Sequence, residues 1–245
     1  MNRRPPLLST AQHAFFLDFD GTLVNFESSL TEIRLSDQLA TVLGSLRANA
    51  SGAVALISGR SLESIDQIFR GHKALPAAGQ HGVERRSASG ELRRIRLSPG
   101  PMDRVRHALS EALVPFPMLL LEDKGESIAL HYRSAPSMGR RALRIMREML
   151  DLAGPDYMLQ PGSCVVDLKT RRGNKGRAIA AFMRESPFRG RIPVFIGDDV
   201  TDEDGFVVVN DLDGVSIKVG AGPTSARWRL PDSRAVIGWL AACPK

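Results

Sequence analysis

The chain has 245 residues, which is enough for one large domain or for a domain that carries an insert. A hydrophobic content of 43% and a charged content of 24% are typical of globular proteins and exclude disordered and fibrous classes. The longest apolar runs fall far short of the roughly 18 residues needed to cross a membrane, so we expect no membrane partner. The net charge is +6, but the arginines are scattered and not interleaved with aromatic residues. We therefore expect no nucleic-acid partner.

The cysteines and the N-terminus indicate the compartment. Cys164 and Cys243 have no metal-ligand spacing and suggest no disulfide framework. The apolar stretch after His13 is interrupted at Asp18, too soon for a secretion signal. We therefore expect a cytoplasmic protein, and we expect it to be a monomer.

The first third of the chain predicts strands that alternate with helices. Short apolar runs typical of buried strands end at Asp18 and at Ser58, and Ser61 is a plausible N-cap for the helix that follows. The expected strands span residues 14–17 and 53–57, and the expected helices span 36–49 and the segment from Ser61 onward. This alternation is the signature of an open parallel sheet.

The same alternation returns late in the chain. Asn174 is expected to cap a helix, and a strand over residues 193–196 ends at Gly197-Asp198-Asp199. A last strand is expected over 216–219, and a closing helix over 234–242. Both ends of the chain therefore contribute to one α/β core.

The middle of the chain predicts a different unit, made of a helix and a hairpin twice over. Strand alternation is clear in residues 127–133, where apolar and polar side chains take turns. The other expected elements are helices 102–113 and 139–152 and strands 118–122, 157–160 and 164–169, the last two joined by a Pro161-Gly162 turn. We expect a discontinuous parallel core of residues 1–97 and 170–245, with a smaller α+β domain inserted at 98–169.

Two acids follow the first strand. In an extended segment, residues two apart point the same way, so Asp18 and Asp20 can face one site, and Gly21 permits a sharp turn. An Asp-Gly pair between apolar residues is also the usual signal of a hairpin turn. The position of the two acids favours a functional site over a hairpin turn, because buried parallel strands present ligand-binding residues at their carboxyl ends.

A second acidic group, residues 198–204, holds five acids. Thr201 and Asp204 fit a capping box, and acids at a helix start are favoured by the helix dipole. That explanation does not extend to Asp198 and Asp199, which come directly at the end of a strand. These two acids are therefore candidate metal ligands.

The acids and two further residues suggest a phosphate site with a metal. If the two strands are neighbours, Asp18, Asp20 and Asp198 converge, and clustered carboxylates repel one another unless a cation such as Mg²⁺ lies among them. Ser58 can donate its hydroxyl, and Lys175 offers a cation at a helix start. Each also has an ordinary interpretation, as a turn serine or a solvated lysine.

These groups occur in the order of the four motifs of the haloacid-dehalogenase (HAD) superfamily, which the chain resembles. The motifs are Asp18-Phe19-Asp20-Gly21-Thr22, Ser58, Lys175 and Gly197-Asp198-Asp199-Val200-Thr201-Asp202. The resemblance implies that Asp18 is the nucleophile and Asp20 the general acid/base. It implies that Ser58 and Lys175 hold the phosphoryl group. The implied Mg²⁺ ligands come from Asp18, Asp20, Asp198, Asp199 and Asp202.

The inserted segment should determine the substrate. Glu122 and Lys124, and again Asp167 and Lys169, place an acid and a base on one face of a strand. One interpretation is ordinary cross-strand charge pairing on a solvated face. The other is a rim of donors and acceptors suited to sugar hydroxyls.

Longer segments are similar to the trehalose-6-phosphate phosphatases over nearly the whole chain. They are Leu56–Arg60, Gly79–Glu84, Glu122–Gly125, His131–Arg133, Cys164–Lys169 and Gly197–Glu203. The resemblance implies a role in trehalose biosynthesis and a mobile α/β cap that recognises glucose. In this sequence the later cap acid is Asp167 where Glu is usual, and Ser163 stands where Lys is common. The implied substrate-binding residues are Gly21, Gly59, Arg60, His81, Gly82, Glu122, Lys124, Arg133, Asp167 and Lys169.

Three alternatives remain open at this point. One is another sugar phosphatase of the same superfamily, acting on sucrose phosphate or a hexose phosphate. Another is a phospho-acceptor that does not hydrolyse, although Asp20 argues against it because an acceptor needs no acid/base. The third is a basic nucleic-acid-binding protein.

Overall fold

The computed structural model describes residues 4–24, 35–70, 72, 74–96, 100–162 and 164–245. The chain divides into two compact units. The core unit comprises Met1–Arg94 and Asn174–Lys245, and the inserted unit comprises Ile95–Gly173. The borders predicted at residues 98 and 169 lie a few residues inside those of the inserted unit.

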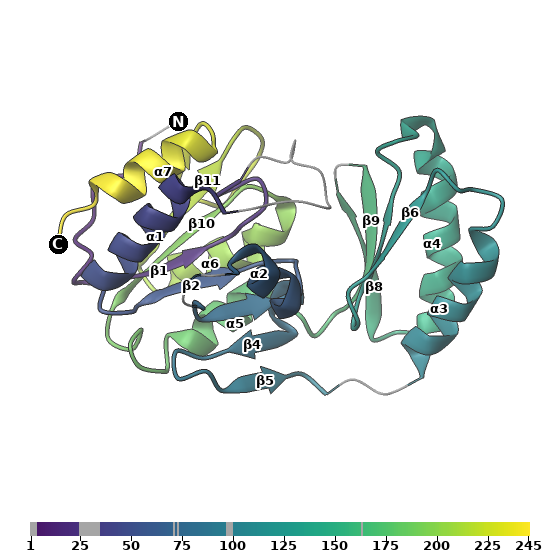
Figure 1. Cartoon of the computed structure of the whole chain (residues 1–245), viewed down its shortest axis with the longest axis horizontal. Coiled ribbons are helices and arrows are strands. Elements are labelled where there is room, and N and C mark those ends of the chain that lie inside the picture. Colours follow the sequence, from purple (N-terminus) through teal and green to yellow (C-terminus); the bar gives the residue numbers. More distant parts are fainter. Residues whose placement is uncertain (1–3, 25–34, 71, 73, 97–99, 163) are drawn as a thin grey trace. The chain divides into compact units, whose positions relative to one another are not determined.

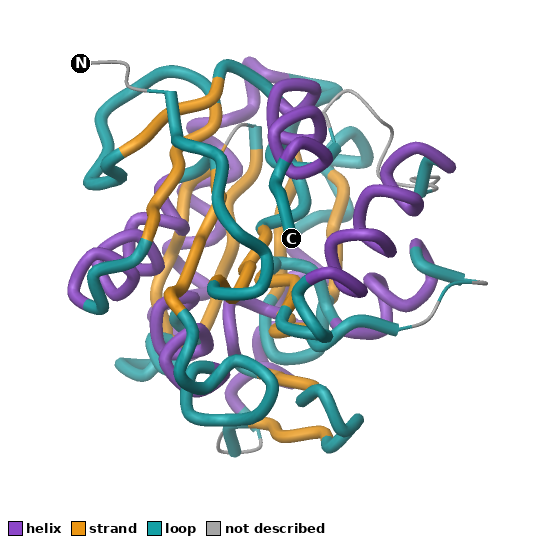
Figure 2. Tube along the Cα trace, turned by 90° about the vertical axis from the view of Figure 1, so that its left-hand side faces the viewer, coloured by secondary structure: helices purple, strands orange, loops and turns teal. Residues whose placement is uncertain are grey.

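The core unit is built on an eight-stranded sheet with the strand order β12-β11-β10-β1-β2-β3-β4-β5. The strands from β12 to β3 are parallel, whereas β4 and β5 extend the sheet as an antiparallel hairpin. Figure 2 shows these strands side by side. They are β1 (His13–Leu17), β2 (Val54–Ile57), β3 (Ala77–Gly79), β4 (Glu84–Arg86), β5 (Leu92–Arg94), β10 (Ile192–Gly197), β11 (Val215–Val219) and β12 (Trp228–Leu230).

Helices cover both faces of this sheet, with α1 and α7 on one face and α5 and α6 on the other (Figure 1). The predicted N-caps are confirmed, because Ser61 accepts the N–H of Ser64 and Asn174 accepts that of Arg177. The helices are α1 (Asp37–Asn49), α2 (Leu62–Ile68), α5 (Lys175–Phe182), α6 (Glu203–Asp211) and α7 (Ser233–Ala242), with short 3₁₀ turns η1 (Gln80–Gly82) and η3 (Val200–Asp202).

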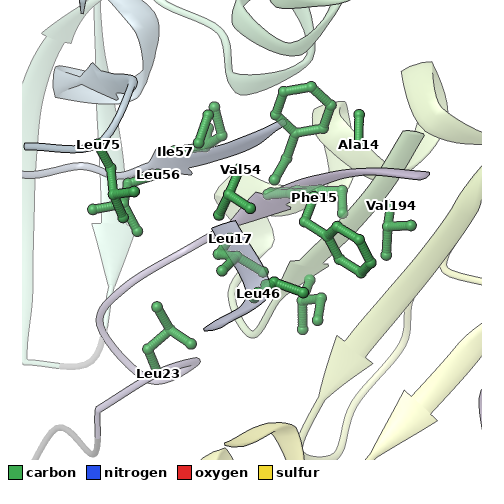
Figure 3. Close-up of a cluster of buried hydrophobic side chains, with 14 of the residues drawn as sticks. Ala14, Phe15, Leu17, Leu23, Leu46, Val54, Leu56, Ile57, Leu75 and Val194 are labelled. Carbon is green, nitrogen blue, oxygen red and sulfur yellow. The ribbon is translucent and has the colours of Figure 1, made fainter. Parts of the chain in front are cut away.

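Strand β1 lies at the centre of the sheet, between β2 and β10, and all five of its residues are buried. Figure 3 shows Phe15 and Leu17 of β1 beside Val54 and Leu56 of β2. Strands covered on both faces are expected to be continuously apolar, and this is why the sequence pattern identified them. Because β1, β2 and β10 run parallel, their carboxyl ends meet at one edge of the sheet.

The inserted unit has a four-stranded antiparallel sheet with the order β6-β7-β9-β8. Its helices pack on one face and bury Ile128, Leu130 and Leu168, each 0% exposed. The predicted pattern of helix and hairpin, twice over, is confirmed. The elements are α3 (Pro101–Ala112), β6 (Leu120–Asp123), β7 (Ile128–His131), η2 (Pro136–Met138), α4 (Gly139–Ala153), β8 (Tyr157–Gly162) and β9 (Val165–Thr170).

The structure corrects one predicted turn. Pro161 and Gly162 do not form a turn, because they continue β8 and pair with Val166 and Val165. Proline is tolerated there because β8 is an edge strand, so its missing N–H removes no bond inside the sheet. Strands β3, β4, β5 and β12 were not predicted, and each has only three residues. None of the helices in the described part of the chain combines the length and the hydropathy needed to span a bilayer.

Candidate active site

Asp18 follows directly on β1 and is buried, with 4% of its surface exposed. Its backbone N–H donates to the carbonyl of Ile196 on β10, which extends the parallel pairing to this residue. The carboxylate oxygen Oδ1 accepts a hydrogen bond from Nζ of Lys175 at 2.8 Å, and Oδ2 lies 3.2 Å from the hydroxyl of Thr22. The predicted nucleophile is thus held on both oxygens at the end of the central strand.

Lys175 is the first residue of α5 and joins two acids. Its buried ammonium donates to Asp18 at 2.8 Å and to Asp202 at 2.6 Å. Burial alone would lower the pKa of Lys175, but the charges of Asp18 and Asp202 outweigh burial and raise the pKa above its ordinary value. Lys175 therefore stays a cation at this edge of the sheet.

Asp202 supports the loop that follows β10. It is fully buried, and its Oδ2 accepts the backbone N–H groups of Asp198 and Asp199, each at 2.9 Å. Gly197 makes this possible, because a Cβ there would collide with the Asp202 carboxyl group. Both oxygens of Asp202 are consequently engaged, one by Lys175 and the other by the backbone.

The capping box predicted from Thr201 and Asp204 is wrong. The box instead pairs Asp199, the N-cap of η3, with Asp202. The turn begins immediately after the strand, so the cap position falls two residues earlier than the helical pattern suggested. Asp199 uses its Oδ1 to accept the N–H of Val200 at 2.7 Å.

Three carboxylates form one cluster in the described part of the chain. One oxygen each from Asp18, Asp198 and Asp202 lies within 4.8 Å of the others. Burial raises the pKa of Asp18 well above its ordinary value, Lys175 opposes this, and the other two acids add to it. Burial and Asp202 likewise raise the pKa of Asp198 to about 6. Since the ionised forms are disfavoured without further positive charge, the cluster fits a hard divalent cation by both charge and oxygen donors.

Asp20 lies outside this cluster. Its carboxylate accepts two hydrogen bonds from Arg60, from Nε at 2.7 Å and from Nη2 at 2.6 Å. The adjacent Gly21 has φ +82° and donates its N–H to Val24, which turns the chain away after Asp20. The segment is therefore not the hairpin turn that Asp-Gly pairs often form.

Five predicted residues come together beside β2. Ser58 is fully buried, and its Oγ accepts the backbone N–H of Arg60 at 3.1 Å. His81 donates its backbone N–H to the carbonyl of Ser58, and its ring lies so close to Gly59 that a Cβ there would meet it at 2.8 Å. His81 and Gly82 have φ of 56° and 98°. A left-handed histidine is strained, and such strain is typical of functional sites.

Two residues of this region were given no role from the sequence. The hydroxyl of Thr22 lies between Asp18 and Asp198, 3.1 Å from Oδ1 of the latter. Lys218, buried at the end of β11, donates to the backbone carbonyl of Asp198. The sequence could have identified Lys218, because a lysine within a buried apolar run needs a hydrogen-bond acceptor nearby.

In the inserted unit, the outward face of the sheet carries a charged group. Lys124 donates to Asp167 at 2.9 Å and lies 3.7 Å from Glu122, while Nε2 of His131 lies 2.9 Å from Glu122. Three predicted residues are thus in one group, and His131 was missed as a member. Lys169 is buried on β9 and Arg133 is exposed after β7. Ser163 lies outside the described residues.

Comparisons with known proteins identify the family to which the chain belongs. A family model described as Trehalose-phosphatase matches residues 16–234. The chain is 42% identical to the trehalose-6-phosphate phosphatase of Escherichia coli (strain K12) over 231 residues, covering 94% of this chain and 86% of that protein. It is 38% identical, with the same coverage, to a probable trehalose-phosphate phosphatase of Sinorhizobium fredii (strain NBRC 101917 / NGR234).

A solved structure of a trehalose-6-phosphate phosphatase related protein matches with a TM-score of 0.77 at 25% identity, covering 93% of this chain and 95% of that one. The predicted fold class, an HAD-type parallel core with a smaller α+β insert, is confirmed. Both the family match and the two relatives extend over most of the chain, insert included. The chain belongs to the trehalose-phosphatase family.

Proposed function

We propose that the chain hydrolyses trehalose 6-phosphate to trehalose and inorganic phosphate through a phosphorylated Asp18, and so takes part in trehalose biosynthesis. The observation that carries the proposal is the placement of Asp18, buried at the end of the central strand with Lys175 and two further acids around it. Family membership supports trehalose 6-phosphate as the substrate, and the geometry of the site supports phosphoryl transfer to Asp18.

The proposed reaction has two steps. Asp18 attacks phosphorus, the bond from phosphorus to the sugar oxygen breaks, and Asp20 gives a proton to that oxygen. Asp20 then takes a proton from a water molecule, which attacks the phosphorylated Asp18 and releases phosphate. Two easier steps replace one difficult displacement, and Lys175 and Ser58 hold the phosphoryl oxygens in both.

The acid cluster is the proposed Mg²⁺ site. Asp202 accepts three hydrogen bonds, one from Lys175 and two from backbone N–H groups, whereas Asp18 accepts one from Lys175 and one from Thr22. We therefore propose Asp18 and Asp198 as the carboxylate ligands and Asp202 as their support. When bound, the ion supplies positive charge that offsets the charge of the phosphoryl oxygens. The high pKa of Asp198, about 6, supports this assignment, because the pocket disfavours an uncompensated carboxylate.

We propose that the inserted unit recognises the sugar through Glu122, Lys124 and Asp167. Lys124 is hydrogen-bonded to Asp167, and the two side chains are 13% and 15% exposed. Half-buried charged groups held in place lose less conformational entropy on binding than free ones do. The proposal also includes a cytoplasmic monomer with no nucleic-acid partner, which gel filtration and salt-dependent oligonucleotide binding would test.

The decisive experiment is phosphate release from a panel of sugar phosphates, with Mg²⁺ or with a chelator. We expect a large preference for trehalose 6-phosphate, loss of activity with the chelator, and near-complete loss in Asp18→Asn. Equal turnover of glucose 6-phosphate, sucrose phosphate and trehalose 6-phosphate would overturn the sugar assignment and leave the reaction class. Stable phosphorylation without release of phosphate would instead identify a phospho-acceptor.

A variant of the inserted unit separates the two parts of the proposal. Glu122→Ala should impair trehalose 6-phosphate far more than a small ester such as p-nitrophenyl phosphate. The small ester needs the core chemistry but no sugar recognition. Similar losses on both substrates would show that Glu122 acts structurally.

A further inference from the structure

The outward face of β7 lies between two charged strands. Ala129 has Glu122 of β6 and Asp167 of β9 as its Cα partners, and His131 has Leu120 and Val165. Paired residues in a sheet point to the same face, so the side chains of Ala129 and His131 lie on the face that carries the acids. The opposite face of β7 is buried by the helices.

Two of the contacts that Glu122 makes differ in geometry. Its Oε2 lies 2.9 Å from Nε2 of His131 but 3.7 Å from Nζ of Lys124. The first distance is that of a directional hydrogen bond, whereas the second is an electrostatic contact without a fixed direction. A carboxylate only accepts, so Nε2 of His131 carries the hydrogen in this contact.

The side chain of His131 is less exposed than that of the acid it contacts. Its side chain is 14% exposed, whereas that of Glu122 is 36% exposed. Lys124 lies nearer to Asp167 than to Glu122 and is therefore shared between two acids. The imidazole is therefore a short, half-buried donor beside the long side chain of Glu122.

We propose that His131 is a positioning residue for sugar recognition, which orients the Glu122 carboxylate so that it can accept a sugar hydroxyl. The inference rests on the proposed function of the chain. Ordering a glutamate side chain costs conformational entropy, and His131 makes that ordering part of folding instead of part of binding. The competing explanation is an ordinary surface pair that contributes nothing to binding.

The test compares His131→Leu, which removes the donor, with His131→Gln, which keeps an N–H donor. His107→Leu, on the exposed side of α3 with a side chain 79% exposed, is the matched control. We expect His131→Leu to raise KM for trehalose 6-phosphate about tenfold relative to KM for p-nitrophenyl phosphate, the effect of one charge-assisted hydrogen bond. His131→Gln should recover most of the loss, and His107→Leu should match the wild type.

A double variant makes the test specific to the pair. In a Glu122→Gln background, His131→Leu should cause little additional loss, because the interaction is already weakened. Full additivity, or an equal effect of His131→Leu on both substrates, would overturn the role of His131. A wild-type chain that does not hydrolyse trehalose 6-phosphate would overturn the proposed function itself, and the inference with it.

Discussion

The guanidinium of Arg60 spans both carboxylate oxygens of Asp20, with contacts of 2.7 Å and 2.6 Å. The backbone N–H of Arg60 also donates to Ser58, so the pair is anchored beside the proposed phosphate-holding serine. A bidentate pair fixes the plane of the carboxylate as well as its charge. Each oxygen of Asp20 accepts one of these bonds and keeps a further lone pair, so Arg60 can orient Asp20 and still leave it able to handle a proton.

Replacement of Arg60 should therefore affect substrates according to their leaving group. We expect Arg60→Gln to lower kcat for trehalose 6-phosphate by about 10²-fold, the lower range for loss of general acid catalysis. The effect on p-nitrophenyl phosphate should be much smaller, because nitrophenolate leaves without a proton. Steady-state kinetics with the two substrates measure the difference, and Asp20→Asn provides the reference pattern. Equal losses would show that Arg60 acts on the phosphoryl group instead of on Asp20.

Lys175 should be a major contributor to stability. In Lys175→Met, the buried Asp18 and Asp202 lose the cation that pairs with them. We expect the free energy of unfolding at neutral pH to fall by about 3–5 kcal/mol. Urea denaturation without Mg²⁺ measures this loss. Addition of Asp18→Asn to the variant should recover part of the stability, because one unpaired charge is removed. An unchanged midpoint would mean that solvent reaches the site and screens these acids.

Removal of Mg²⁺ should have a pH-dependent effect on stability. The folded-state pKa of Asp198, about 6, lies above its ordinary value of 3.8. The favourable contribution of this group is therefore fully present below about pH 4 and is lost as the pH rises through about 6. A cation compensates for the ionised form, so Mg²⁺ should raise the melting temperature more at pH 7.5 than at pH 5. Thermal melts at the two pH values measure this, and an equal shift at both would contradict a role for Asp198 as ligand.

Sugar binding should be sensitive to the size of the side chain at position 129, because Ala129 lies between charged residues. It is 0% exposed on the charged face, between Glu122 and Asp167. Lys124, which directly follows β6, donates to Asp167 on β9. In Ala129→Leu, the larger side chain should displace Lys124 from Asp167 and raise KM for trehalose 6-phosphate several-fold. Turnover of p-nitrophenyl phosphate and the melting temperature serve as controls. A stable variant with wild-type KM would show that this charged face takes no part in sugar binding.

Local patterns in the sequence predicted the core strands and the helix caps at Ser61 and Asn174, and the resemblance of four short motifs to a known superfamily gave the reaction class. Strands β1, β2 and β10 are buried on both faces, so each appears as an uninterrupted apolar run that ends in polar residues. Ser61 and Asn174 were recognisable because a capping side chain acts on residues two or three positions away. Asp18 was a candidate nucleophile for the same reason, since its position depends on the strand immediately before it.

Only the tertiary structure decided which distant side chains hydrogen-bond to one another. Arg60 and Asp20 are 40 residues apart and meet because β1 and β2 are neighbours in the sheet. The capping box is formed by Asp199 and Asp202 instead of Thr201 and Asp204 because the turn begins right after β10. His131 became relevant through cross-strand pairing with β6. Propensity and periodicity act over a few residues, whereas hydrogen bonds between distant strands depend on register. Register emerges only when the whole sheet is packed.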